Sequence, residues 1–223
     1  MKLRKEFSHQ ANDQITWRFF LFFVLLNWVT IGFAQTLPSA CGPISNHYGP
    51  YDYRTQLDKL MIVEKHHFTP EVEALIRGKE GWLDGDIAYT LHTSPNHHRA
   101  LIAMARLGDR AGVPKLPNAA YSVECYFQRA VIFARDDTIV RCLYAQFLAK
   151  RKRPEEAKYQ LDAAVEYAKD SGFSHFNIGL IYFELGAHEK ALAEAHAALR
   201  LGFERPELVE LLKAANKWEE PSK

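Results

Sequence analysis

The stretch from Gly172 to Phe203 constrains the fold of this chain more than any other feature of the sequence. It contains two apolar patterns of helical period that meet at residues 185–187, Leu-Gly-Ala. Small residues stand at Gly179, Ala191 and Ala198, on the sides where two helices joined by so short a turn would touch. The distance between packed helices depends on the side chains at their contact. The stretch therefore predicts a helix-turn-helix unit with its two helices close together.

The same unit occurs 34 residues earlier, over residues 138–171. Small residues recur there at the same three positions, which are Ala145, Ala157 and Ala164. Arg153 and Pro154 mark the turn, because proline is favoured at the start of a helix, where its missing N–H costs nothing. We therefore predict two full repeats, over residues 138–171 and 172–205.

Residues 95–137 contain an interrupted third repeat. Phe127 and Ala130 lie in register with the second helix of the following unit. The preceding helical pattern, HRALIAMARLG, comes into register if about eight residues are inserted between the two helices, and the loop GDRAGVPKLPN supplies them. At the other end, residues 206–219 carry an apolar stripe opposite Glu and Lys side chains, formed by Leu208, Leu211, Leu212 and Ala215. This pattern is typical of a capping helix that closes a stack of repeats.

The repeats resemble the tetratricopeptide repeat (TPR) family, whose consensus has Leu-Gly and then Tyr in the first helix and spaced Ala residues in the second. Residues 178–179 (Ile-Gly), Tyr182, Ala191 and Ala198 match this pattern, while Ala195 replaces an aromatic residue. The resemblance implies an all-α solenoid of about three repeats with a capping helix. It also implies a concave groove, lined by the first helix of each repeat, that binds a protein or peptide.

The family register assigns groove positions in the last two repeats. In the last repeat they are the apolar residues Phe173, Phe176, Leu180 and Phe183. The polar groove candidates are Asn177, Gln146 and Lys150, which do not reproduce the side-chain set of the subgroup that binds a terminal carboxylate. Three occupants are open: the N-terminal segment of the same chain, a foreign protein or peptide, and another copy of the chain. A tethered segment avoids most of the cost of association, so we favour the first.

Residues 1–34 have the marks of a secretory signal peptide. A basic start with Lys2, Arg4 and Lys5 precedes the apolar run WRFFLFFVLLNWVTIGFA, and Gly32 and Ala34 are small. We expect cleavage after Ala34, export to the periplasm or outside the cell, and no membrane span in the mature protein. A retained anchor is the alternative.

Residues 35–94 do not match the repeat. Gly and Pro interrupt this segment and aromatic residues recur in it, so we expect irregular structure that packs on the rest of the chain. One short helix is predicted, with Thr69 as N-cap, Pro70 in its first turn and Gly78 at its end. The blocks VEKHHFTPEVEALIRG and DIAYTLHTSPNHHRALIAMARL also resemble a group of exported bacterial TPR proteins that have no assigned activity.

Three cysteines in an exported chain allow one disulfide and one free thiol. The TPR register places Cys142 on the inner face of the stack, so the resemblance favours a bond between Cys41 and Cys142 if the N-terminal segment lies on that face. The alternative is that Cys41, Cys125 and Cys142 are all reduced and buried.

The remaining sequence patterns argue against nucleic-acid binding, metal binding and catalysis by this chain. Lys plus Arg number 28 against 27 for Asp plus Glu, so no basic surface for nucleic acid is indicated. The adjacent pairs His66–His67 and His97–His98 have no metal-ligand spacing, and Asp84 and Asp86 are interpreted as residues of a Gly-containing turn. We expect no metal, no cofactor and no enzyme activity. The sequence favours an exported protein-binding scaffold; the alternative is a structural subunit of an extracellular filament.

Overall fold

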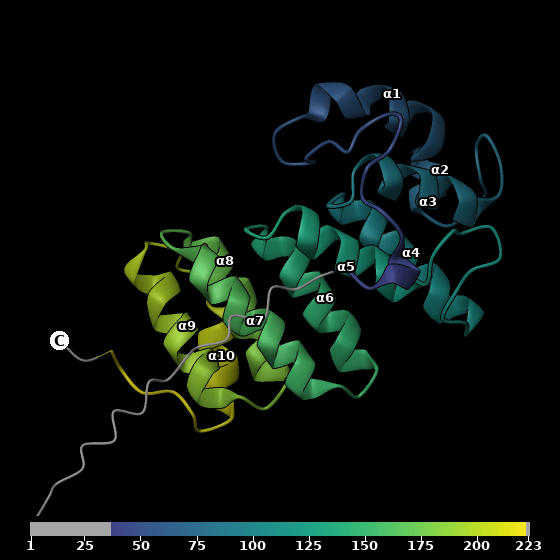
Figure 1. Ribbon diagram of the computed structural model, residues 1–223. Helices are drawn as coiled ribbons and strands as arrows, with labels where there is room; N and C mark the ends of the chain where they lie inside the picture. Colours follow the sequence, from purple (N-terminus) through teal and green to yellow (C-terminus); the bar gives the residue numbers. More distant parts are fainter. Residues whose placement is uncertain (1–36, 222–223) are drawn as a thin grey trace, which may run out of the picture. The chain divides into compact units, whose positions relative to one another are not determined.

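The computed structural model describes residues 37–221, and all regular structure in this range is helical (Figure 1). A short 3-10 helix η1 (Ser39–Cys41) is followed by ten α-helices: α1 (Leu57–His67), α2 (Pro70–Glu73), α3 (Leu83–Thr93), α4 (His98–Ala111), α5 (Val123–Phe133), α6 (Thr138–Lys150), α7 (Pro154–Ala168), α8 (Gly172–Glu184), α9 (His188–Arg200) and α10 (Glu207–Ala214). The predicted all-α, TPR-like solenoid is confirmed. The predicted signal peptide, residues 1–34, lies outside the described residues.

The two full repeats are the helical hairpins α6–α7 and α8–α9. Each hairpin has a connection of three residues, 151–153 and 185–187. Pro154 is the first residue of α7, as the sequence indicates, and Gly186 has a positive φ of 71° that ends α8. Turns this short force each pair of helices to lie antiparallel and adjacent.

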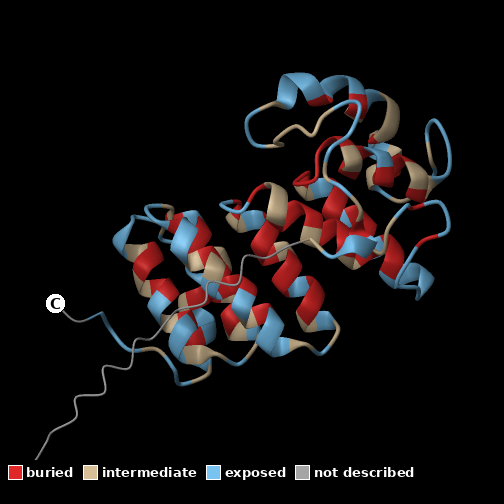
Figure 2. Ribbon diagram, in the orientation of Figure 1, coloured by how far each residue is buried: buried red, intermediate tan, exposed pale blue. Residues whose placement is uncertain are grey.

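Small residues set the separation of the helices in both hairpins. Ala145, Ala157, Ala164 and Ala191 are completely buried. A Cβ added to Gly179 would overlap Leu208 of α10 and would lie 3.1 Å from the Cβ of Glu194. Helix α10 therefore closes the stack, with the side chains of Leu208 and Leu212 inside it. Figure 2 shows the buried residues on the faces where the helices meet.

The connection between α4 and α5 is eight residues longer than the three-residue turns. The position of close approach is Gly108, where an added Cβ would lie 2.8 Å from the Cγ2 of Val123. Fifteen positions separate these two residues, against twelve between Gly179 and Ala191. The loop thus adds three residues to the repeat, where the sequence analysis inserted about eight. The other five residues of its extra length replace helical residues at the end of α4 and the start of α5.

The segment 35–94 is more regular than predicted. It contains two helices that the sequence analysis missed, α1 and α3, and their buried residues include Leu60, Val63 and Leu91. The predicted short helix is a single turn, α2, and Thr69 makes no side-chain capping hydrogen bond. The pattern was obscured because α1 is apolar on two faces and α3 has Asp84, Gly85 and Asp86 in its first turn. Asp is favourable there, since the first turn of a helix attracts negative charge.

A disulfide between Cys41 and Cys125 fastens the start of the described chain to α5. The predicted partner of Cys41 is therefore wrong, and Cys142 is a free, buried thiol. The family register places Cys142 correctly on the inner side of α6, but η1 contacts α5 instead. The buried guanidinium of Arg129 strengthens this attachment, because its Nη1 donates to the carbonyl oxygens of Cys41 at 2.9 Å and Pro43 at 2.6 Å.

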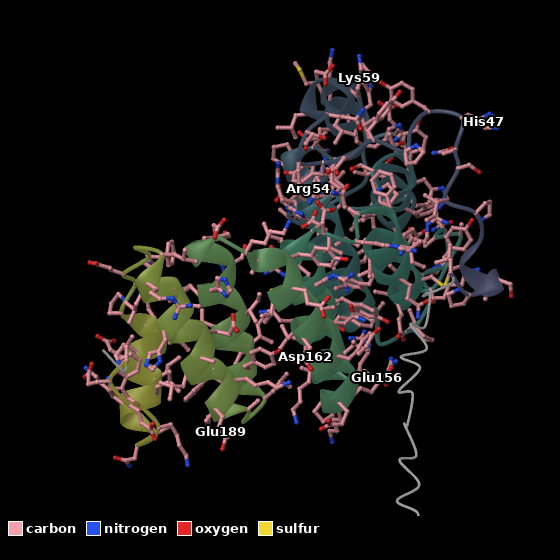
Figure 3. The ribbon with its side chains drawn as sticks, turned by 60° about the vertical axis from the view of Figure 1, so that its left-hand side comes forward. His47, Arg54, Lys59, Glu156, Asp162 and Glu189 are labelled. Carbon is pink, nitrogen blue, oxygen red and sulfur yellow. A yellow bond between two sulfur atoms is a disulfide. The ribbon has the colours of Figure 1, made fainter. Side chains whose placement is uncertain are left out.

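A second attachment lies at the N-terminus of α6, around Asp137. This carboxylate accepts hydrogen bonds from the backbone N–H groups of Ile139 and Val140, so it caps the helix. It also contacts His98 Nε2 at 2.8 Å and accepts from Asn96 Nδ2 at 3.0 Å. Arg54, labelled in Figure 3, lies 3.5 Å from the same carboxylate. One side chain thus links the N-terminal segment, α4 and α6.

Candidate protein-binding groove

The first helices of the three repeats, α4, α6 and α8, line a groove. It consists of two hollows of about 200 and about 410 Å³ that share the residues Leu143, Gln146 and Glu184. The first hollow lies between α6 and α8, and the second lies between α4 and α6 and reaches Glu184 of α8. The groove is therefore continuous across all three repeats, as the TPR resemblance implies.

The part between α6 and α8 is mainly apolar. Phe173 is 51 % exposed and Ile139 is 37 % exposed, so both present large apolar surface to solvent. Leu180 is half-buried on the wall, and Cys142 is buried among the lining residues. Burial raises the pKa of the Cys142 thiol to about 12, which keeps it neutral at physiological pH. This part of the groove offers contact area rather than reactivity.

Two of the predicted groove residues do not line the groove. Phe176 is only 8 % exposed, and its ring packs 5.2 Å from that of Phe203. Phe183 is half-buried beside His188, at the turn between α8 and α9. The prediction that Phe176 and Phe183 line the groove is therefore wrong. Helix α8 has apolar residues on more than one side because one of these sides packs against α9 and the turn after it. Only Phe173, Asn177 and Leu180 of this helix were correctly assigned to the lining.

The polar groove candidates have different surroundings. Asn177 Nδ2 donates to the carbonyl oxygen of Phe173 at 2.7 Å, so its amide bonds its own helix. Gln146 is exposed where the two hollows meet. Lys150 lies in the second hollow, with its Nζ 3.5 Å from the carboxylate of Asp109. All three line the groove.

Sequence reasoning missed several lining residues, among them Leu143, Arg106 and Glu184. Leu143 precedes Asn177 by 34 positions, so the repeat period contained the signal for it. Arg106 was hidden by the interrupted repeat, whose register the sequence does not settle. Arg106 and Glu184 make no ion pair with any residue in the range 37–221, and they bring one charge of each sign to the groove.

The predicted cover by the N-terminal segment is not found in the described residues. The lining residues of both hollows come from positions 102–184, and none comes from residues 37–94. Residues 37–94 instead contact α4 and α5, and Arg54 reaches Asp137 at the N-terminus of α6. The preferred occupant in the sequence analysis is therefore wrong for this segment, and the apolar wall at Phe173 and Ile139 has no cover from it.

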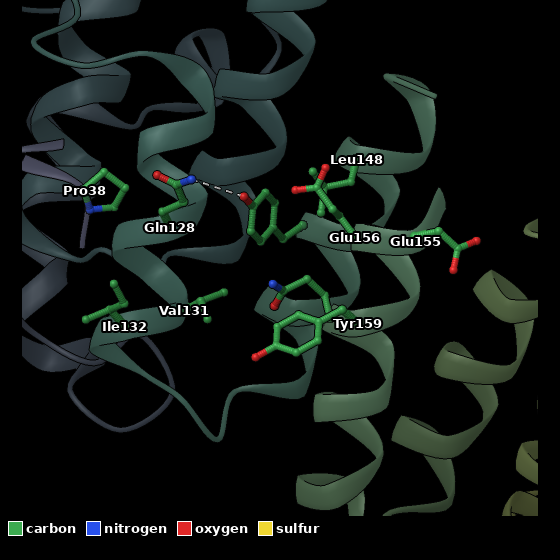
Figure 4. Close-up of a pocket in the computed structure, with 10 residues that line it drawn as sticks. Pro38, Gln128, Val131, Ile132, Leu148, Glu155, Glu156 and Tyr159 are labelled. Atoms are coloured by element: carbon green, nitrogen blue, oxygen red, sulfur yellow. Dashed lines mark hydrogen bonds between the residues drawn. The ribbon is translucent and has the colours of Figure 1, made fainter. Parts of the chain in front are cut away.

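Another hollow, of about 450 Å³, lies between α5 and α7, with Tyr144 and Leu148 of α6 between them (Figure 4). Its polar side chains have partners within the chain. Gln128 Nε2 lies 3.5 Å from Tyr144 Oη, and the Glu156 carboxylate pairs with Arg153 at 2.6 Å. Most of its lining comes from the second helices α5 and α7, and it shares no lining residue with the two hollows of the groove.

The acidic and histidine candidates serve the fold. Asp86 accepts hydrogen bonds from the backbone N–H groups of residues 79–81 and contacts His67 Nδ1 at 2.8 Å. Asp84 accepts from the backbone and side chain of Asn118. Both aspartates lie in the first turn of α3, so their interpretation as turn residues is wrong. Within residues 37–221, no group of three or more His, Cys, Asp or Glu side chains could hold a metal ion.

The neighbouring histidines point to different partners. His97 Nε2 lies 3.0 Å from the Glu64 carboxylate, and its Nδ1 accepts from the backbone N–H of Ala100, which caps α4. His98 instead bonds Asp137. Each imidazole is thus engaged in joining helices.

Comparison with curated proteins finds a distant relative. The chain is 26 % identical over 176 residues to DnaJ homolog subfamily C member 3 of Gallus gallus, a TPR-containing protein. The match covers 72 % of this chain and 35 % of that protein, so the chain spans about a third of its relative's length. No family model matches the sequence. No solved structure matches it either. The similarity is compatible with a TPR-like scaffold that has protein partners.

Among residues 37–221, the helices are too short or too polar to cross a membrane.

Proposed function

We propose that this chain is an exported, non-enzymatic scaffold that binds an extended or helical protein segment in the groove of α4, α6 and α8. The observation that carries the proposal is the continuous, partly apolar groove along the first helices, with Phe173 and Ile139 exposed in it. Exposed aromatic residues in a hollow are typical anchors of protein interfaces. The TPR-containing relative supports the same class of function.

Two observations support export. The pattern of residues 1–34 is typical of a signal peptide, and a disulfide such as Cys41–Cys125 persists in oxidising compartments. The resemblance to exported bacterial TPR proteins agrees with a periplasmic or extracellular location. For the filament alternative we find no supporting feature in the described residues, and α10 closes one end of the stack.

The binding proposal is tested by selecting peptides from a random library on the immobilised protein and measuring their affinity in solution. Phe173→Ser should weaken a selected peptide by about tenfold or more, because the loss of an aromatic anchor costs over about 1 kcal/mol. Leu211→Ser on α10 is the matched control, since Leu211 is 40 % exposed and outside the groove. Equal affinities for the wild type and both variants would place the binding site elsewhere and overturn the proposal.

A further inference from the structure

Helix α1 has an apolar face that no residue in the range 37–221 covers. Leu57 is 53 % exposed, Met61 is 72 % exposed and Ile62 is 51 % exposed. The opposite face of the helix, with Leu60 and Val63, is buried against the rest of the chain. Helix α1 therefore has apolar residues on two sides. The side with Leu60 and Val63 packs in the core, and the side with Met61 faces solvent. Large apolar side chains exposed together on one helix face mark a candidate interaction site.

The charges on this face are self-complementary. Asp58 and Lys65 lie seven residues apart, which is two helical turns, so both belong to the same face as Met61. Among the ion pairs of residues 37–221, Asp58 has one, with its neighbour Lys59 at 3.2 Å, and both side chains are more than half exposed. Lys65 has no ion pair among residues 37–221. Figure 3 labels Lys59 on α1 at the outer edge of the ribbon.

An antiparallel copy of the same helix fits both features. If a two-fold axis passes between Met61 and Ile62, each Met61 contacts the Ile62 of the other copy. The same axis places each Asp58 opposite a Lys65, once on each side of the apolar centre. A contact that repeats itself about a two-fold axis is isologous and ends at two copies.

The geometry points to a second copy of this chain as the partner of the α1 face, in an isologous antiparallel dimer. One helix from each copy buries less than the 1,200–2,000 Å² of a standard interface, so the dimer dissociates on dilution, at about micromolar or higher concentration. Helix α1 contributes no residue to the groove, which stays open in both copies. The dimer is independent of the proposed function and presents two grooves.

A lipid surface fits this face less well. Asp58 lies within it, and a carboxylate is costly to bring into an apolar layer. The range 57–82 contains four Lys or Arg residues and five Asp or Glu residues, so it has no attraction for anionic lipids. The opposite charges of Asp58 and Lys65 match each other across a two-fold axis and do not match a membrane.

Exchanging the charges tests the register as well as the dimer. The mass of the full chain is measured by sedimentation over a dilution series from about 1 mM to about 1 µM. The wild type should pass from dimer to monomer. Asp58→Lys and Lys65→Asp should each weaken the dimer by about tenfold or more, because each places like charges opposite one another twice.

Mixing the two charge variants gives the decisive readout. In a mixed pair, the lysine introduced at position 58 of one chain faces the aspartate introduced at position 65 of the other. The unchanged Lys65 of the first chain faces the unchanged Asp58 of the second, so the mixture should form heterodimers near the wild-type affinity. Met61→Glu should abolish the dimer, while Leu211→Glu on α10 should leave it unchanged. Far-ultraviolet circular dichroism confirms that each variant is folded.

Three results would overturn the proposal. The first is a wild-type chain that stays monomeric at every concentration. The second is a mixture of the charge variants that remains monomeric while the wild type dimerises. The third is binding of the wild type, and not of Met61→Glu, to phosphatidylcholine vesicles, which would assign the face to a membrane.

Discussion

The two hairpins α6–α7 and α8–α9 differ from the N-terminal part of the fold, η1 to α4, in how they are held together. Each hairpin closes through a three-residue turn and packs on small residues that are near in sequence. The N-terminal part depends on contacts between distant residues: a disulfide spanning 84 positions and the pair of His97 with Glu64, 33 positions apart. Local patterns therefore specify the hairpins, whereas long-range bonds specify the N-terminal part.

Of the changes that test this difference, removal of the disulfide should reduce the stability of the protein most. Cys125→Ser should lower the free energy of unfolding by about 2–5 kcal/mol, because the bond closes a long loop in the unfolded chain. Urea denaturation of the wild type and the variant, each with and without reductant, measures the loss. Reductant should destabilise the wild type and leave Cys125→Ser unchanged.

Cys142→Ser is the control for this experiment. It should still respond to reductant, because Cys142 is a free thiol. If reductant had no effect on Cys142→Ser, Cys142 would be part of the disulfide. That result would favour the predicted pair Cys41–Cys142 over the bond between Cys41 and Cys125.

A pair of glycine substitutions compares the packing of the two regions. Gly179→Ala should destabilise the chain by about 1–3 kcal/mol, since the added methyl group meets Leu208 and Glu194. Gly85→Ala in α3 should stabilise it by up to about 1 kcal/mol, because the nearest atom to the new Cβ is Asn118 Cβ at 3.8 Å. Thermal denaturation measures both. Destabilisation of similar size by the two changes would show that α3 is packed as tightly as the repeat.

Acid should weaken the N-terminal part first. Burial lowers the pKa of His97 and of His92 below the value of 6.5 for an exposed histidine. The unfolded chain therefore binds protons more readily below about pH 6.5, so these residues contribute full stability above that pH and lose it as the pH falls towards their folded pKa. The loss is at most about 1.4 kcal/mol per pH unit for each histidine.

Glu194 in the last hairpin should respond in the opposite direction. Burial raises its pKa above 4.5, so the folded chain takes up this proton first and the hairpin gains relative stability as the pH falls through that range. Amide hydrogen exchange at about pH 7 and pH 5.5, corrected for the intrinsic exchange rate, should show protection falling around the start of α4 before α8–α9. Equal losses of protection at the start of α4 and in α8–α9 would contradict the expected difference in acid sensitivity between the two regions.

The candidate groove was predictable in the repeats that keep the 34-residue period. Phe173, Asn177, Leu180, Gln146 and Lys150 follow from register, and all line the groove. Phe176 and Phe183 could not be excluded from the lining, because a sequence does not show that Phe203 and His188 cover them. Arg106 was beyond prediction, since the loop after α4 changes the register of its repeat.

The sequence alone determined the elements whose signals are local: the all-α class, the two hairpins, their turns at Pro154 and Gly186, and the capping helix. Helical period and turn residues act over a few positions, so they can be seen without a partner. The tertiary structure alone decided the pairing of Cys41 with Cys125 and the helices α1 and α3. It also decided that residues 37–94 leave the groove open. These features depend on which distant segments pack together. The periodic pattern of one segment does not show which other segment it will contact.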